Sequence, residues 1–181
     1  MNAALALFET RKDNLAIADS GNRTPEGAQA YIAHDSTKTK GWELELAGEI
    51  APGWSVQGGY TRVLSRDSSG NRLNTLHPLH QVKLFSTYTP SSMPRLTLGG
   101  GLNWQSKIYS TAADSVGLRR YLTQSGYAVV NVMGRYQIGR GMDLAVGINN
   151  LLNKDYYAHV DHYGIGYGAE RNFYASVKYS F

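Results

Sequence analysis

The sequence contains no cysteine and no long apolar run. Without cysteine, disulfide scaffolds, cysteine-ligated zinc, iron–sulfur clusters and thiol nucleophiles are excluded. The first apolar stretch, Ala3 to Phe8, is far shorter than the about 20 residues that a membrane-spanning helix needs, which excludes a helical membrane protein. No cleavable signal is visible after Met1, because a basic region is lacking there. We therefore expect any export signal to lie outside this chain.

The chain also has little net charge. The chain of 181 residues has 18 Lys and Arg against 14 Asp and Glu, a formal net charge of +4. This is not the charge density of a nucleic-acid binder, and the length fits one domain. Glycine and tyrosine are abundant instead, with 20 and 13 copies. Because Gly costs about 1 kcal/mol in a helix interior, the composition argues against a helical domain.

Apolar and polar residues alternate with a period of two along most of the chain, which predicts β-strands. Between Trp42 and Ile50, for example, Leu44 and Leu46 face one way and Glu43 and Glu45 the other. Similar alternation predicts strands that start at Trp54 and lie near residues 80–89, 96–105, 130–137, 142–149 and 172–181. Less regular strands near 3–17 and 29–50 bring the expected number to eight.

The connections between these strands alternate in length. They are short near residues 51–53, 90–94 and 139–141, and long near 18–29, 67–79, 107–125 and 158–168. Outer-membrane barrels combine short periplasmic turns, long outer loops and two aromatic girdles. Aromatic residues lie near both strand ends here: Trp42, Trp104 and Phe173 at the long loops, and Trp54, Tyr88, Tyr136 and Phe181 at the short turns. The pattern predicts an all-β fold, an antiparallel transmembrane β-barrel meander of about eight strands.

This fold assigns one phase of the alternation to lipid. The expected lipid-facing residues are Leu44, Leu46, Val56, Leu84, Leu98, Leu102, Val130, Leu144, Val177 and Tyr179. A soluble β-sandwich or lipocalin-like barrel would place the same residues inside. Three features favour the membrane barrel: several charges on the polar face, the alternating loop lengths, and a chain that ends on an aromatic strand.

Three segments resemble motifs of one family. Residues 148–157, Ile-Asn-Asn-Leu-Leu-Asn-Lys-Asp-Tyr-Tyr, resemble the N-N-L-F-D-K-x-Y segment near the end of TonB-dependent outer-membrane receptors, with Leu152 and Asn153 in place of Phe and Asp. Residues 168–173 resemble the closing G-x-P-R-N strand, with Glu170 in place of proline. Residues 39–45 resemble the S-x-G-x-E-x-E strand. Residues 73–88 and 99–109 resemble the siderophore branch, of ferripyoverdine and ferric hydroxamate type.

The resemblance implies a place in a larger molecule. Such receptors have a barrel of about 22 strands filled by an N-terminal plug, and residues 1–181 resemble the last eight strands, with the plug and the TonB-contacting box absent. The implied function is TonB-dependent uptake of ferric siderophores across the outer membrane. The implied partners are the ferric siderophore, outer-membrane lipid and lipopolysaccharide, and TonB through the missing N-terminal part. We expect no enzymatic activity, no nucleic-acid partner and no cofactor, since the iron arrives inside the ligand.

Other possible sites have simpler interpretations. His77–His80 and His159–His162 are both H-x-x-H. A metal site needs at least three converging ligands, so we expect loop histidines in contact with water or lipopolysaccharide. Glu43, Glu45 and Glu49 are expected on the solvated inner wall of the barrel. The segments 19–22 and 67–71 lack the full ligand set of a calcium loop, and we expect flexible outer loops. The glycine run 99–101 has no following helix, so a phosphate-binding loop is not expected.

Ligand recognition is the remaining candidate function. Loop aromatics and arginines suit an anionic, aromatic ferric chelate. The candidate contacts are Tyr109, Arg119, Arg120, Tyr121, Tyr163 and Tyr167. For each of them, loop or interface packing is the alternative. At the level of the whole chain, the alternatives are a self-standing eight-strand outer-membrane barrel, with an adhesive or structural role, and a soluble binding barrel.

Overall fold

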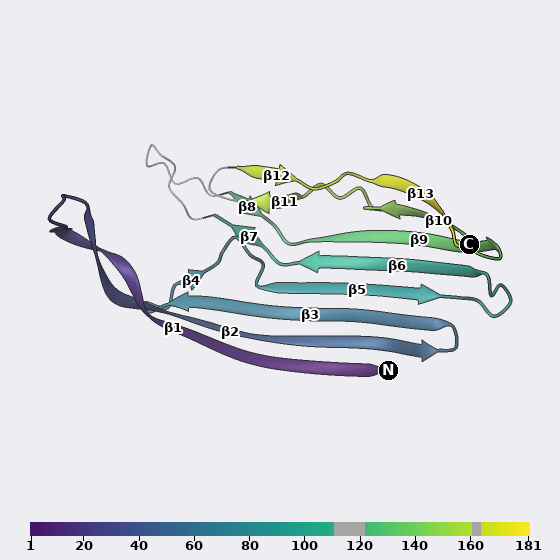
Figure 1. The fold of residues 1–181 in the computed structure, drawn as a ribbon, viewed down its shortest axis with the longest axis horizontal. Helices are drawn as coiled ribbons and strands as arrows, with labels where there is room; N and C mark the ends of the chain where they lie inside the picture. Colours follow the sequence, from purple (N-terminus) through teal and green to yellow (C-terminus); the bar gives the residue numbers. More distant parts are fainter. Residues whose placement is uncertain (111–121, 161–163) are drawn as a thin grey trace.

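The computed structural model describes residues 1–110, 122–160 and 164–181. Eight strands form one antiparallel sheet in the order β1-β2-β3-β5-β6-β9-β10-β13 (Figure 1). They are β1 (Asn2–Arg23), β2 (Gln29–Ala51), β3 (Trp54–Asp67), β5 (His80–Tyr88), β6 (Leu96–Gln105), β9 (Tyr127–Gly139), β10 (Met142–Asn149) and β13 (Asn172–Tyr179). The described residues contain no helix with the length and hydropathy of a membrane span.

Five short strands lie at one end of the sheet. They are β4 (Arg72–Leu73), which pairs with β3, and two small hairpins, β7 (Ile108–Tyr109) with β8 (Thr123–Gln124) and β11 (Tyr157–Val160) with β12 (Ile165–Tyr167). The predicted eight-strand antiparallel meander is therefore confirmed, and three of the expected long loops carry extra strands.

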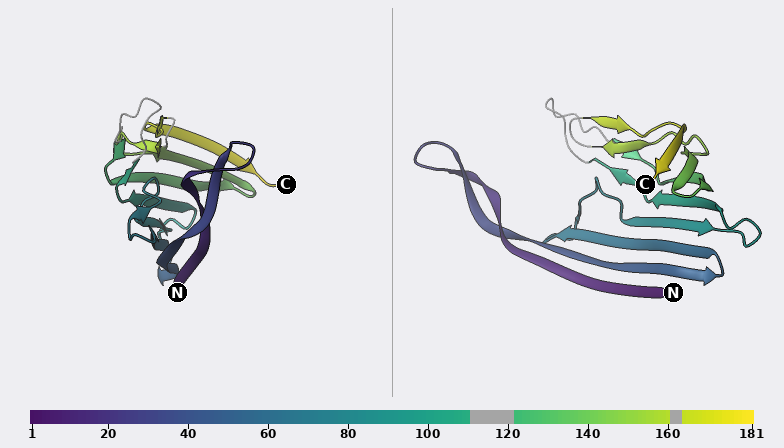
Figure 2. Two further views of the ribbon diagram at one scale, coloured as in Figure 1. Left: turned by 90° about the vertical axis from the view of Figure 1, so that its left-hand side faces the viewer. Right: turned by 45° about the vertical axis from the view of Figure 1, so that its right-hand side comes forward.

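The sheet is open and curved, with β1 and β13 at its edges (Figure 2). A self-standing eight-strand barrel would need these two edges to pair. The ladders of the described strands contain no such pairing. The fold thus favours a part of a wider barrel over a small closed one.

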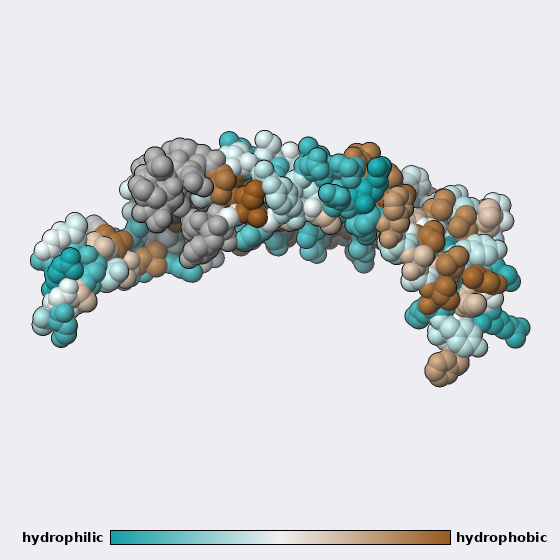
Figure 3. All heavy atoms as spheres, turned by 90° about the horizontal axis from the view of Figure 1, so that it is seen from above, coloured by the Kyte–Doolittle hydropathy of each residue, from teal (hydrophilic) through white to brown (hydrophobic). Residues whose placement is uncertain are grey.

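The strand register places the predicted lipid-facing residues on one face. Leu46, Gly58, Leu84, Leu102 and Val130 are directly paired across five successive strands. Many large apolar side chains on this outer face are exposed, including those of Leu84, Leu98, Val146, Phe173 and Val177. Exposed apolar side chains over several strands indicate a surface that contacts a non-aqueous environment. Figure 3 shows such apolar side chains gathered toward the short-turn end.

The two aromatic girdles are also present. At the long-loop end, the rings of Trp42 and Tyr60 lie 4.5 Å apart. At the short-turn end, the rings of Trp54 and Tyr88 meet edge-on at 6.4 Å. Trp54 is the first residue of β3, as predicted, whereas Trp42 lies inside β2 opposite Arg62 and not at the end of that strand.

One predicted connection is wrong. Instead of a loop over 18–29, strand β1 runs to Arg23, and a turn over residues 24–28 leads into β2. The cross-strand pairs Ile17 with Ile32 and Ala18 with Tyr31 continue the ladder, because apolar residues lie opposite each other there. The segment 19–22, expected as an outer loop, therefore belongs to a two-stranded ribbon that projects beyond the sheet (Figure 1).

Candidate functional site

The long-loop end of the sheet has a small core of its own. Ile108 and Val160 are each 3% exposed, and Ser110 is 2% exposed. The two hairpins contact each other through side chain and backbone: the Tyr157 N–H donates to Gln124 Oε1 at 2.7 Å. The Tyr109 N–H donates to the carbonyl of Thr75 at 2.8 Å, which ties β7 to the segment before β5. This end is therefore a packed rim.

Tyr109 lies near two cationic side chains at this rim. The Arg72 guanidinium carbon is 5.9 Å from the centre of the Tyr109 ring, and Lys107 Nζ is 5.5 Å from it. Both distances are within the range of a cation–π interaction. Arg72 also donates to the carbonyl of His77 at 3.1 Å. The rim thus presents an aromatic ring flanked by two positive charges, which suits an anionic, partly aromatic ligand.

A second group of tyrosines lies on β9 and the β11–β12 hairpin. Tyr127 stacks on Tyr156 at 4.5 Å, and Tyr157 meets Tyr167 edge-on at 5.4 Å. Gly168 makes the first stack possible, because a Cβ there would lie 2.2 Å from the Tyr156 ring. The Tyr167 side chain remains exposed, so it is available to a ligand.

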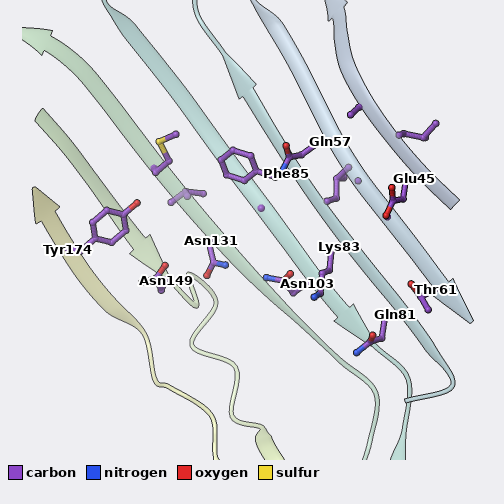
Figure 4. Close-up of a pocket in the computed structure, with 18 residues that line it drawn as sticks. Glu45, Gln57, Thr61, Gln81, Lys83, Phe85, Asn103, Asn131, Asn149 and Tyr174 are labelled. Atoms are coloured by element: carbon purple, nitrogen blue, oxygen red, sulfur yellow. The ribbon is translucent and has the colours of Figure 1, made fainter. Parts of the chain in front are cut away.

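Below the rim, the concave face of the sheet is mostly polar. The close-up in Figure 4 shows Lys83 and Asn103 side by side, with Gln81, Thr61 and Asn131 around them. These residues line a hollow of about 820 Å³. Phe85 and Tyr174 interrupt this polar wall, and Tyr174 lies against Gly147, where a Cβ would come within 2.6 Å of its ring and hydroxyl. The wall offers amide and charged groups to water or to a second chain segment.

A family model for the β-barrel of TonB-dependent receptors matches residues 1–151. The chain belongs to the TonB-dependent receptors.

Among curated relatives, the ferric-pyoverdine BN7/BN8 receptor of Pseudomonas putida is 38% identical over 182 residues, which cover all of this chain and 21% of the relative. The ferripyoverdine receptor of Pseudomonas aeruginosa is 36% identical and is covered over 23% of its length. The chain therefore spans about a fifth to a quarter of these receptors.

Solved structures of receptors of this family also match the chain. The ferripyoverdine receptor of Pseudomonas aeruginosa bound to ferripyoverdine matches with a TM-score of 0.89 and 35% identity, over 99% of this chain and 25% of that one. The structure of the FpvAI–pyocin S2 complex matches with a TM-score of 0.90 at the same identity and coverage. The resemblance predicted from three sequence motifs is confirmed.

The motif that carried the family resemblance has a clear structural role in this receptor segment. Asn150 is 2% exposed and has a left-handed backbone with φ of 52°. Its side-chain amide donates to the carbonyls of Lys154 and Ala169, at 2.9 and 3.0 Å, and its Oδ1 accepts the Lys154 N–H at 2.8 Å. Asn153, also left-handed, accepts the Arg171 N–H at 3.0 Å. The two asparagines thus fasten the end of β10 to the start of β13.

Of the predicted ligand contacts, the structure describes two. Tyr109 is on β7 and Tyr167 is on β12, both at the rim. Arg119, Arg120, Tyr121 and Tyr163 lie outside the described residues. Tyr109 contacts Arg72 and Lys107, and Tyr167 contacts Tyr157. Within the described ranges, no ring contact joins Tyr109 to Tyr167.

Arg72 and Lys107 are not among the contacts predicted from the sequence. Lys107 could have been found, because residues two apart in an extended segment lie on one side of it, and Lys107 precedes Tyr109 by that interval. Arg72 could not, since its position depends on the pairing of β4 with β3.

The histidine and carboxylate predictions have mixed outcomes. His80 Nδ1 lies 2.5 Å from the Tyr60 hydroxyl on the outer face, so this histidine is part of the aromatic girdle. Glu45 lines the concave wall as predicted, and Glu49 accepts the Gly53 N–H at 2.8 Å in the adjoining turn. The described residues contain no group of three or more His, Asp or Glu side chains placed to hold a metal ion; His162 lies outside them.

Proposed function

We propose that the protein is an outer-membrane receptor that takes up ferric siderophores of the pyoverdine type with energy supplied through TonB. The identity over the whole chain to receptors named for ferric pyoverdine supports this. The observation that carries the proposal within this chain is the Tyr109 ring at the rim, with the Arg72 guanidinium and Lys107 Nζ 5.9 and 5.5 Å from its centre.

The chemistry of the rim suits such a ligand. An iron chelate with carboxylate or hydroxamate oxygens bears negative charge at its periphery, which guanidinium and ammonium groups attract. An aromatic part of the chelate would stack on a tyrosine. The iron is cargo inside the ligand, and we propose no resident metal or cofactor and no enzymatic step for this chain.

The remaining partners belong to the same proposal. The exposed apolar outer face would contact outer-membrane lipid, with lipopolysaccharide in the outer leaflet. TonB would act through a segment other than these strands. No nucleic-acid partner is proposed, given the modest net charge.

A binding measurement on the full-length gene product tests the proposal. We expect the double variant Arg72→Gln, Lys107→Gln to bind a ferric pyoverdine about tenfold more weakly, because each charge at a partly exposed site contributes modestly. Tyr109→Ala should weaken binding as well, and Tyr109→Phe should not, since it keeps the ring face. Folding of each variant is checked by its heat-dependent gel mobility.

Uptake of radioactive iron supplied as the same chelate provides the functional readout. Uptake that persists in a strain without TonB would contradict the proposed mechanism. Unchanged chelate affinity in both the double variant and Tyr109→Ala would contradict the proposed site.

A further inference from the structure

Basic side chains gather on the outer face of β2 and β3 at the long-loop end. We call Lys38, Lys40, Arg62 and Arg66 the basic outer-face patch. Arg62 is paired with Trp42, and Lys38 is paired with Arg66 across the β2–β3 ladder. Lys40 lies between Lys38 and Trp42 on β2, opposite Leu64. Three of the four side chains are exposed, and Arg62 is half-buried.

The position of the patch on the lipid side follows from its neighbours. Trp42 and Tyr60 are in ring contact, and Tyr60 is hydrogen-bonded to His80, so all three share the outer face. Side chains two apart on a strand point the same way. Arg62 and Arg66 therefore share the face of Tyr60, and Lys38 and Lys40 share the face of Trp42.

The patch lies where an outer leaflet would place its headgroups. Trp54 marks the girdle at the short-turn end of β3, and Arg62 is about 27 Å from it along the strand at about 3.4 Å per residue. Arg66 is about 41 Å from it by the same measure. With a strand tilt of about 40°, these distances become heights of about 21 and 31 Å, which bracket the upper edge of an apolar band about 25 Å tall.

The patch carries more positive charge than its surroundings neutralise. Glu9 is the acidic partner of both lysines, with oxygens 2.8 Å from Lys38 Nζ and 3.1 Å from Lys40 Nζ. Arg66 donates to the carbonyl of Gly70, a neutral acceptor. Among the residues that the structure describes, Arg62 has no ion-pair partner. Glu9 is therefore shared by the two lysines, and the patch keeps an excess of positive charge.

Like charges also stand directly beside one another. Lys38 is paired with Arg66, and Arg66 is paired with Arg72 on β4, which forms a row of three cations across three strands. Like charges directly opposite each other destabilise a sheet. A bound anion would relieve that repulsion, and an anion with several oxygens could bridge neighbouring strands.

We propose that the basic outer-face patch binds the phosphate groups of a lipid A headgroup in the outer leaflet. Guanidinium groups match phosphate oxygens in charge and geometry, and clusters of Lys and Arg beside a membrane-spanning element are a recognised feature of anionic-headgroup binding. The aromatic row directly below, with Trp42 and Tyr60, would contact the top of the acyl chains. This inference rests on the outer-membrane placement proposed above. Arg72, which adjoins the patch, is also a proposed chelate contact, and none of the variants that test this inference changes Arg72.

The test measures binding of purified diphosphoryl lipid A to the full-length gene product in detergent, by native mass spectrometry. The variant Lys40→Gln, Arg62→Gln, Arg66→Gln should bind at least about tenfold more weakly. The matched control Arg95→Gln, Arg135→Gln, Arg140→Gln removes the same charge from exposed residues elsewhere, and it should bind as the parent does. Heat-dependent gel mobility confirms that each protein is folded.

Three further arms sharpen the result. Glu9→Gln should tighten binding about threefold, because it frees two lysines, and it keeps the proposal testable if the triple variant does not fold. Lipid A without phosphates should bind weakly to every variant. Inorganic phosphate at equal concentration should not compete, since it lacks the acyl chains that contact the aromatic row.

Several outcomes would overturn the inference. One is equal affinity for lipid A with and without phosphates. Another is an equal loss in the matched control, which would indicate general charge attraction. Effective competition by inorganic phosphate would indicate a free-anion site, and unchanged binding in both the triple variant and Glu9→Gln would exclude the patch. Loss of chelate binding in the Arg72 and Lys107 variant is a separate result, so failure of the proposed function and failure of this inference are distinguishable.

Discussion

The two ends of the sheet are held together in different ways. At the short-turn end, Pro52-Gly53 and Arg140-Gly141 form two similar turns, with φ of 74° at each glycine. At the long-loop end, three connections carry short strands, buried residues and side-chain hydrogen bonds between remote segments. The short-turn end uses the same glycine turn twice, whereas the contacts at the long-loop end depend on individual side chains.

The two turns also bond to the next strand in the same manner. The Thr89 N–H donates to the Gly53 carbonyl at 2.8 Å, and the Ser180 N–H donates to the Gly141 carbonyl at 2.7 Å. A Cβ on either glycine would lie within 2.4 Å of the carbonyl oxygen of Thr89 or Ser180. Backbone geometry therefore determines the short-turn end, and side-chain identity determines the long-loop end.

The largest effect is expected in the band between the two ends. Leu102 lies midway on the outer face of β6, and Asn103 beside it faces the concave wall. Leu102→Arg should lower the free energy of unfolding in lipid vesicles by about 2–4 kcal/mol, because it places a charge against lipid. Asn103→Arg should cost much less. Urea titration of the full-length protein in vesicles measures both, and equal losses would contradict the facing assignment.

Asn150→Ala should be the most damaging neutral substitution at the long-loop end. It removes three side-chain hydrogen bonds and leaves buried backbone groups unsatisfied, at about 1 kcal/mol each. We expect a loss of about 3 kcal/mol in the same titration. Asn149→Ala, which removes one exposed bond to Asn172, is the matched control. A loss below about 1 kcal/mol for Asn150→Ala would show that the asparagine does not fasten this end.

At the short-turn end, Gly53→Ala and Gly141→Ala should have similar effects on stability. Each places a Cβ in a left-handed conformation against a neighbouring carbonyl, so we expect a loss of about 2 kcal/mol in each case. Gly139→Ala is the control, because nothing lies within 4 Å of its Cβ position. If the two turn variants differed strongly, the two turns would not be equivalent.

The smallest effect concerns pH at the base of the projecting ribbon. Hydrogen bonds from Lys38 and Lys40 lower the pKa of Glu9 below its usual 4.5. The folded chain therefore favours the carboxylate, and the stabilisation is present above pH 4.5 and is lost as the pH falls through the lower folded pKa. The protection of amides near Glu9 against hydrogen exchange, relative to an unfolded peptide at the same pH, should decrease slightly in that acidic range. In Glu9→Gln this decrease should disappear; its persistence would mean that another group causes it.

Much of the fold could be predicted from the sequence, because each strand carries its own pattern. The alternation of Leu44 and Leu46 with Glu43 and Glu45 determined both the strand and its faces, since side-chain direction in a strand has a period of two. The Pro-Gly and Arg-Gly turns could likewise be predicted from two adjacent residues. The family was predictable from the asparagine motif at residues 148–157, although its role in fastening β10 to β13 was not.

The projecting ribbon and the rim could not be predicted from such local patterns. The irregular segment 18–29 resembles a loop locally, and it extends the ladder only because Tyr31 and Ile32 lie opposite Ala18 and Ile17. Likewise, the residues of the basic outer-face patch are separated in the sequence, and the register of β2 and β3 brings them together.

The sequence by itself determined which residues share the apolar outer face, where the strands turn and to which family the chain belongs, because these depend on neighbours within a few residues. Only the tertiary structure decided that Arg72 lies beside Tyr109 and that Gln124 holds Tyr157. These contacts join segments about 35 residues apart, and the strand pairing that brings them together is a property of the whole sheet.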